Sequence, residues 1–174
     1  MPRDKVKSFT LEGAFGPVIK TVSTADLVEK GNLSKPIIQM VLQEYPEHVE
    51  RQYHMSYDDI YNECIVQHES RNSKIVDIVN LIKATNKEAR IMLLVRSLEH
   101  GKELQRLISD AFYLQGSDDI STRYDRIKSF LHEDQSVLIG TKILQTGIDI
   151  TEITHFIMCR GMKSEEATLQ PIGS

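Results

Sequence analysis

The sequence of 174 residues predicts an α/β fold, in which a mainly parallel sheet is flanked by helices. From about Ser56 onward, short apolar runs that suit strands alternate with segments whose apolar residues recur at helical spacing. The connections between these segments are short, as they are where each strand is followed by a helix that returns the chain to a parallel sheet. The length is enough for one domain with an apolar core.

Four segments of this region have the apolar periodicity of helices. The first candidate spans residues 57–67, and the second spans residues 71–83. In the second, one buried face is formed at spacing i, i+3, i+4, i+7 by Ile75, Ile78, Val79 and Ile82. Leu104, Leu107, Ile108 and Ala111 mark a third helix, and Ile120, Tyr124, Ile127 and Leu131 mark a fourth.

Four apolar runs between these helices are strand candidates. Residues 91–95 form a continuous apolar run with polar neighbours, which is typical of a strand covered on both faces of a parallel sheet. Shorter runs at residues 112–114, 137–139 and 155–159 complete the predicted sheet. In such sheets, ligands bind beyond the carboxyl ends of the strands.

Residues 1–55 form a lead-in, and residues 56–174 form the α/β domain that follows it. The lead-in contains a glycine-rich turn at residues 13–17 and a short helix candidate from Thr24 to Lys30, which Gly31 could end. Residues 36–42 then form a β-rich run that is closed by Tyr45 and Pro46.

Composition excludes several classes of protein. Apolar residues make up 40% of the chain and charged residues 26%, which fits a folded domain better than a disordered or membrane-spanning one. A net charge of -4 argues against a broad basic surface but permits local phosphate contacts. The two cysteines and six scattered histidines have neither disulfide nor zinc spacing, so we expect no metal site. The amino terminus has no apolar signal segment, and we expect the protein in the cytoplasm.

Small, polar or basic residues follow each predicted strand. They occur in residues 95–97, 114–117, 139–142 and 159–161. Glycines let a backbone approach a phosphate closely, and hydroxyl and basic groups donate hydrogen bonds to it. Turns in any α/β protein are rich in the same residues, so a phosphate-facing edge and ordinary turns both remain open interpretations.

One of these strand ends, residues 140–150 (Gly-Thr-Lys-Ile-Leu-Gln-Thr-Gly-Ile-Asp-Ile), resembles motif V of superfamily 2 helicases. By this resemblance Thr141 and Thr146, with Lys142, contact the nucleic-acid backbone, while Gly147 and Asp149 approach a nucleotide between two RecA-like domains. The alternative is a tight turn in which Asp149 is a cap or is solvated.

Other segments resemble helicase motifs in the expected order. Residues 91–102, with Arg96, Ser97 and His100, resemble motif IV, and Gly116 resembles the glycine that ends the next strand. By this resemblance these four residues also contact the nucleic acid. Residues 168–173 resemble the start of motif VI, in which Gln170 lies on the nucleotide side. Each residue also has a simpler interpretation as a solvated side chain or a helix-terminal polar residue. The order of the motifs identifies the chain as similar to the C-terminal RecA-like domain of a superfamily 2 helicase.

This resemblance implies the second motor domain of an ATP-dependent DNA helicase, which unwinds or branch-migrates DNA in recombination and repair. Its partners would be single-stranded or branched DNA and the first RecA-like domain of the same helicase. ATP and Mg²⁺ would bind only together with that first domain. An alternative from another class is a truncated module that binds DNA or a partner without catalysis, and a third is an unrelated α/β protein that binds a nucleotide or metabolite.

Three departures from the helicase pattern limit what the chain can do alone. The sequence contains neither the Gly-x-x-x-x-Gly-Lys-Ser/Thr phosphate loop nor an Asp-Glu-x-His acidic box. Where the motif VI pattern places an arginine after Gly173, this chain has Ser174, and Pro171 disfavours helical geometry at Gln170. An arginine finger contributes about 10³ to 10⁵ in rate, so we expect the isolated chain to be inactive, with no catalytic residue of its own.

Overall fold

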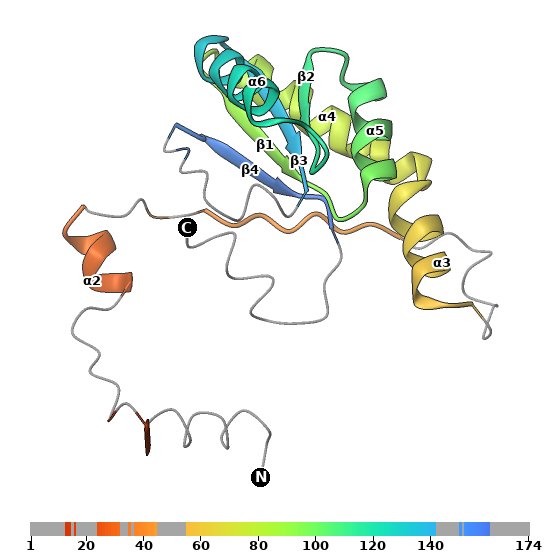
Figure 1. Cartoon of the computed structure of the whole chain (residues 1–174), viewed down its shortest axis with the longest axis horizontal. Helices are drawn as coiled ribbons and strands as arrows, with labels where there is room; N and C mark the ends of the chain where they lie inside the picture. The colour runs from red at the N-terminus through yellow and green to blue at the C-terminus, as the bar shows by residue number, and fades with distance from the viewer. Residues whose placement is uncertain are drawn as a thin grey trace. The chain divides into compact units, whose positions relative to one another are not determined.

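The computed structural model describes residues 13–14, 16, 24–31, 35, 37–44, 55–141, 150 and 152–160 (Figure 1). Contacts divide the chain into two units, Met1–Val41 and Leu42–Ser174. The first unit contains helix α2, Thr24–Glu29, and Gly31 follows it with φ of 72°, which confirms the short helix predicted in the lead-in. Among the described residues, no helix is long and apolar enough to cross a membrane. The boundary at residue 55 between the lead-in and the α/β domain stays a prediction.

The second unit contains a parallel sheet of four strands in the order β2-β3-β1-β4. The strands are β1 (Arg90–Leu94), β2 (Ala111–Leu114), β3 (Ser136–Gly140) and β4 (His155–Met158). Leu94 pairs with both Gly140 and Met158, and Leu114 also pairs with Gly140. The carboxyl ends of all four strands therefore lie in one row, and the predicted α/β fold with a mainly parallel sheet is confirmed.

Helices cover both faces of this sheet (Figure 1). The chain enters through α3 (Tyr57–Tyr61), which continues directly into a π-helix, η1 (Asn62–Val66). Helices α4 (Glu69–Thr85) and α5 (Leu98–Leu107) pack on one face, and α6 (Ile120–His132) packs on the other. The result is the three-layer α/β/α arrangement that a RecA-like domain requires.

The core consists of two apolar clusters, one on each side of the sheet. Alternate residues of β1 serve the two clusters, because successive strand side chains point to opposite faces: Ile91 and Leu93 meet α4 and α5, whereas Met92 meets α6. Phe130 of α6 is fully buried in the second cluster. Since β1 is covered on both faces, its sequence is apolar without interruption from Ile91 to Leu94.

The third predicted helix was misplaced at both ends. Its apolar spacing suggested a helix that reached Ala111, but α5 ends at Leu107 and Ala111 is the first residue of β2. The helix begins at Leu98 because the Ser97 side chain caps it, accepting a hydrogen bond from the His100 N–H at 3.2 Å. The apolar periodicity continued through the connecting turn and concealed the end of the helix.

The β-rich run at residues 36–42 was wrongly predicted as a strand. Its described part, residues 37–42, belongs to no strand, and its large apolar side chains are exposed. Strand propensity describes how well a side chain fits a pleated, half-buried surface, and it cannot supply the neighbouring strand. Farther along, Lys74 Nζ donates to the Leu42 carbonyl at 3.0 Å, so this point of the chain is held against α4.

Candidate nucleic-acid interface

Polar and basic residues follow the strands at the carboxyl edge of the sheet. The strand pairing extends by one residue, because the Val95 N–H donates to the Gly140 carbonyl at 3.0 Å and the Cys159 N–H donates to the Leu94 carbonyl at 2.9 Å. Immediately beyond β2, β3, β1 and β4 come, in spatial order, Gln115–Gly116, Thr141, Arg96 and Arg160. The four strand ends for which a phosphate-facing edge was one interpretation therefore form one continuous row.

Arg96 lies against two aromatic rings at the end of β1. Its guanidinium carbon lies 5.0 Å from the centre of the Tyr57 ring and 4.8 Å from the centre of the Tyr61 ring. One guanidinium nitrogen is 3.3 Å from Oδ1 of Asp58. Cation–π attraction and this ion pair thus fasten Arg96 to α3, while 44% of its side chain stays exposed.

Arg71 of α4 ties the same helix to the sheet. It donates to the Cys159 carbonyl at 2.7 Å, just beyond β4, and to the Ile65 carbonyl of η1 at 3.4 Å. Tyr61 is buried beside it, and burial raises the pKa of Tyr61 while Arg71 and Arg96 act in the opposite direction. The position of α3 and η1 on the carboxyl edge is therefore fixed by side chains from α4 and from the end of β1.

His100, one residue of the motif IV-like segment, faces inward. It is fully buried, and its Nε2 lies 3.1 Å from Oδ1 of Asn72, whose Nδ2 donates to the Val66 carbonyl at 2.8 Å. Since Asn72 Oδ1 can only accept, His100 Nε2 carries the proton. Burial, assisted by the nearby Arg71, lowers the pKa of His100 to about 4, which keeps the ring neutral. This placement leaves His100 no surface for direct contact with a nucleic-acid strand.

Close packing on α5 surrounds this histidine. A Cβ at Gly101 would lie 2.5 Å from the ring of Tyr113, so only glycine fits at this point of the helix. The Tyr113 hydroxyl donates to the Leu98 carbonyl at 3.1 Å, which fixes the ring against the first turn of α5. Ser97, which caps that turn, is engaged through its side-chain oxygen. Ser97 and His100 therefore set the geometry of the segment that carries Arg96.

Gly116 lies in a loop that side chains of α6 hold closed. Arg123 donates to the Gly116 carbonyl at 3.1 Å and to the Asp118 carbonyl at 2.9 Å. Oδ2 of Asp118 accepts the Gln115 N–H at 2.8 Å and an Arg126 guanidinium N–H at 2.6 Å. Gly116 itself is exposed, so the loop presents a fixed backbone segment at the end of β2.

Of the predicted motif V-like segment, residues 140–150, the structure describes Gly140, Thr141 and Ile150. Thr141 follows β3 directly and is 9% exposed. Five other predicted site residues lie outside the described residues. They are Lys142 and Thr146, predicted to contact the nucleic acid, and Gly147, Asp149 and Gln170, predicted on the nucleotide side.

The two aromatic rings beside Arg96 were not predicted as site residues from the sequence. Tyr57 and Tyr61 stand at spacing i, i+4 on the predicted helix 57–67, which places them on one face of that helix. Their partner Arg96 is distant in sequence, and nothing in the local pattern joins them. The i, i+4 aromatic pair beside a capping Ser56 was the one available signal.

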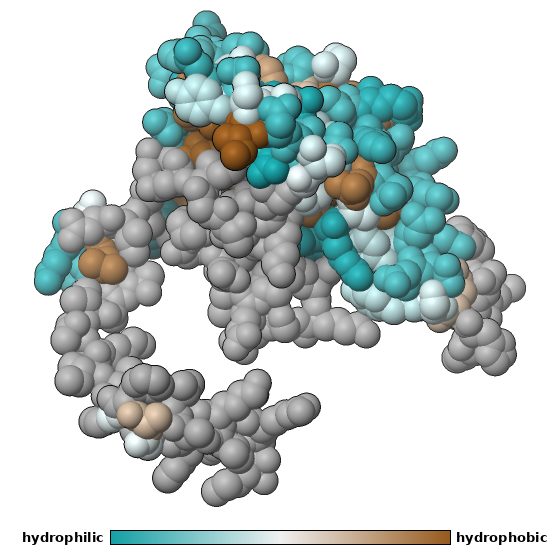
Figure 2. All heavy atoms as spheres, viewed as in Figure 1, coloured by the Kyte–Doolittle hydropathy of each residue, from teal (hydrophilic) through white to brown (hydrophobic). Residues whose placement is uncertain are grey.

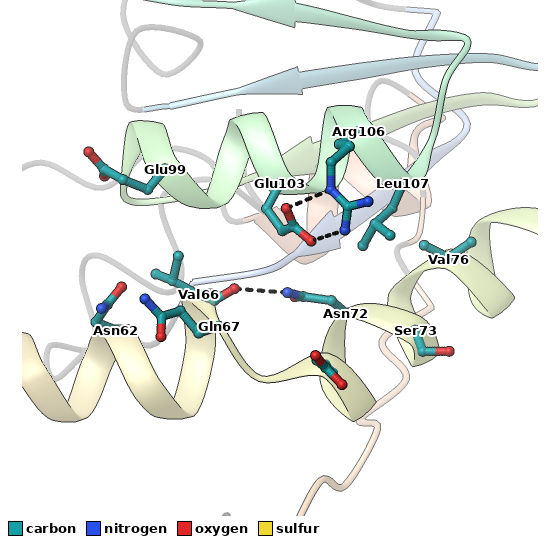
Figure 3. A pocket seen from close by; sticks show the side chains of 11 residues that line it. Asn62, Val66, Gln67, Asn72, Ser73, Val76, Glu99, Glu103, Arg106 and Leu107 are labelled. Atoms are coloured by element: carbon teal, nitrogen blue, oxygen red, sulfur yellow. Dashed lines mark hydrogen bonds and ion pairs between the residues drawn. The ribbon is translucent and has the colours of Figure 1, made fainter.

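A separate groove of about 730 Å³ lies between η1, α4 and α5 (Figure 3). Carboxylates of Glu69, Glu99 and Glu103 line it, and Arg106 pairs with Glu103 at 2.7 Å and 3.0 Å. The hydrogen bond from Arg106 is the first reason why the pKa of Glu103 is lowered. Like charges repel, so the acidic lining does not suit phosphates and this groove is not part of the candidate interface. Teal side chains also dominate the visible described surface, as expected for a polar exterior (Figure 2).

Comparison with known proteins relates the chain to helicases. The helicase conserved C-terminal domain family matches residues 61–173. The ATP-dependent DNA helicase UvsW of enterobacteria phage T4 is 25% identical over 167 residues, which are 92% of this chain and 33% of that protein. The crystal structure of T4 UvsW superposes with a TM-score of 0.59 at 23% identity, covering 74% of this chain and 27% of that one. This chain thus spans about a third of the length of the relative it matches.

Proposed function

Because the chain belongs to the helicase conserved C-terminal domain family, we propose that it acts as the second motor domain of an ATP-dependent DNA helicase. In this role it forms one wall of an ATP cleft and one contact with the DNA backbone. The work of the complete enzyme would be unwinding or branch migration in recombination and repair, in the cytoplasm. The T4 relative is an ATP-dependent DNA helicase, which supports the DNA substrate and the dependence on ATP.

The flush carboxyl edge of the sheet is the observation that carries this proposal. Gly116, Thr141 and Arg96 follow β2, β3 and β1, which are neighbours in the sheet. Adjacent strands are about 4.8 Å apart, so these positions span about 10 Å along the edge. Backbone and hydroxyl groups, flanked by an arginine, suit a short stretch of phosphate backbone. We assign Lys142 and Thr146 to the same strand contact.

Ser97 and His100 serve this contact as positioning residues in the proposal. The Ser97 cap and the buried pair of His100 with Asn72 fix the first turn of α5 and the segment before it, which includes Arg96. A rigid support matters because an arginine that is already oriented loses less conformational entropy when it binds a phosphate. Loss of either residue would weaken binding through Arg96 and not through a lost contact of its own.

The nucleotide side of the proposal rests on Gly147, Asp149 and Gln170 of the motif V-like and motif VI-like segments. The sequence contains neither the phosphate loop nor the acidic box that cradle the phosphates and hold Mg²⁺ in the helicase pattern. We therefore assign the phosphate loop and the Mg²⁺ ligands to the first RecA-like domain of the helicase. This chain would close on the bound ATP from the opposite side of the cleft.

The purified chain alone provides a direct test. We expect weak binding of a single-stranded oligonucleotide that disappears as salt is raised, and no ATP hydrolysis, because the phosphate loop is absent and Ser174 replaces the arginine of the pattern. ATP turnover by the chain alone, lost when Asp149 is changed to Asn, would show that it contains a complete catalytic site. If the chain binds DNA but its complex with the first RecA-like domain hydrolyses no ATP, the alternative of a truncated DNA-binding module is favoured.

A further inference from the structure

The two rings that hold Arg96 differ in exposure. Tyr61 is only 7% exposed and lies on the buried side of α3, whereas Tyr57 is 41% exposed at the start of that helix. Their centres are 6.3 Å apart and their planes are tilted by 40°. The Tyr61 ring therefore supports the Arg96 guanidinium from inside the fold, and the Tyr57 ring lies beside it at the surface.

The support beneath Arg96 is firm, but its ion pair is weak. Arg71 donates to the Ile65 carbonyl of η1 and to the Cys159 carbonyl beyond β4, which ties η1, the continuation of α3, to the end of the sheet. The Asp58 carboxylate that pairs with Arg96 is 85% exposed, and exposed ion pairs contribute about 0 to 1 kcal/mol. A phosphate that arrives from solution can therefore replace Asp58 without disturbing the stack.

From this arrangement we propose that Tyr57 is a stacking platform for an unpaired base of a nucleic-acid strand whose neighbouring phosphate binds Arg96. When no strand is bound, the Asp58 carboxylate pairs with Arg96. An aromatic ring beside an arginine is the combination that single-stranded nucleic acid recognises, because every base has a flat apolar face and every linkage an anionic phosphate. The assignment rests on the proposed function and adds to it a residue outside the family match, which begins at residue 61.

The competing role for Tyr57 is structural. Its ring could simply fasten α3 to the end of β1 through Arg96, without touching any ligand. The two roles differ in one observable property, since only a platform changes its own environment when a strand binds. A spectroscopic probe at residue 57 separates them, because a purely structural ring would keep its surroundings.

The chain contains no tryptophan, so Tyr57→Trp introduces a single fluorescent reporter at this position. Unlabelled oligothymidine is titrated at low salt while tryptophan emission is recorded, and binding is followed independently by the anisotropy of a labelled oligothymidine. The matched control is Tyr124→Trp, because Tyr124 is 66% exposed on α6, which packs on the opposite face of the sheet from α4 and α5. We expect emission from residue 57 to be quenched along the anisotropy curve, and emission from residue 124 to stay constant.

Substitutions at the same position measure the affinity. Loss of one stacked base lowers affinity by about 5- to 150-fold, so we expect Tyr57→Leu to bind that much more weakly and Tyr57→Phe to bind normally. Asp58→Asn should bind several-fold more tightly, because Arg96 loses its competing carboxylate. Thermal unfolding of each variant checks that α3 remains in place.

The possible results separate this inference from the function on which it rests. Oligothymidine binding by anisotropy without quenching at residue 57, or equal affinity of the Leu and wild-type proteins, overturns the platform and leaves the DNA contact intact. Absence of binding in both measurements at low salt overturns the platform together with the proposed strand contact. Equal quenching by blunt duplex DNA would show that the ring does not select unpaired bases.

Discussion

The buried His100 makes the stability of this domain depend on pH, and His100→Gln should remove most of that dependence. The imidazole is fully buried, its Nε2–H donates to Asn72, and Nδ1 has no hydrogen-bond partner within the described part of the chain. A second proton would create a buried cation near Arg71. Glutamine can still donate to Asn72 but cannot titrate, so it isolates the effect of charge.

The size of the effect follows from the pKa shift of His100. Its pKa is about 4 in the folded protein and 6.5 without the surrounding structure, so between these values the unfolded chain binds more protons than the folded one. The stabilisation is fully present above pH 6.5 and is lost as pH falls toward 4. At 1.36 kcal/mol per pKa unit, the loss is about 2 kcal/mol at pH 5 and about 3 kcal/mol at pH 4.

Urea unfolding at pH 7.5, 5 and 4 measures this loss directly. We expect the free energy of unfolding of the wild-type protein to fall more steeply with acid than that of His100→Gln, by the amounts given above. The control is His132→Gln at an exposed position on α6, which should keep the wild-type slope. Equal pH dependence in wild type and His100→Gln would refute the buried, neutral histidine.

Three further substitutions test other parts of the structure. Gly101→Ala should lower the free energy of unfolding by about 1 to 3 kcal/mol in urea titrations, because the new Cβ overlaps the buried Tyr113 ring; an unchanged midpoint would contradict this packing. Arg71→Met should lower the free energy of unfolding by about 1.5 to 3 kcal/mol for each charged hydrogen bond that is lost. In hydrogen exchange of this variant, the amides of η1 should open faster than those of α6. Arg96→Gln should weaken oligonucleotide binding and reduce its dependence on salt by about one counterion; an identical salt slope would exclude the phosphate contact.

The sheet could be predicted from sequence because each strand has a local signal. Residues 91–95 are apolar without interruption, and the structure shows why: β1 is central and packs on α4 and α5 on one side and on α6 on the other. The order of the strands and the register of their pairing were not predicted from these runs. They depend on pairing between segments distant along the chain, such as Leu94 with Met158.

Other features could not be predicted because they depend on tertiary contacts or on the backbone. The π-helical turn η1 has no distinct sequence pattern and continued the apolar periodicity of α3. His100 resembled a polar residue at a helix start, and its burial follows only from the position of Asn72 on another helix. The strand predicted at residues 36–42 shows the opposite failure, since its local signal is strong but the described residues provide no strand to pair with it.

The central claim, that this chain is one half of a helicase motor, is tested most directly by reconstitution. The chain is mixed with a separately produced first RecA-like domain that carries the phosphate loop, and ATP hydrolysis is measured with forked DNA present. A second mixture contains Ser174→Arg, which restores the first arginine of the motif VI pattern. We predict that the Ser174→Arg chain raises ATP hydrolysis above the rate of the first domain alone, and far more than the wild-type chain does. Adding Asp149→Asn to the Ser174→Arg chain should abolish this stimulation. Stable association of the two domains without stimulation in either mixture would contradict the assignment.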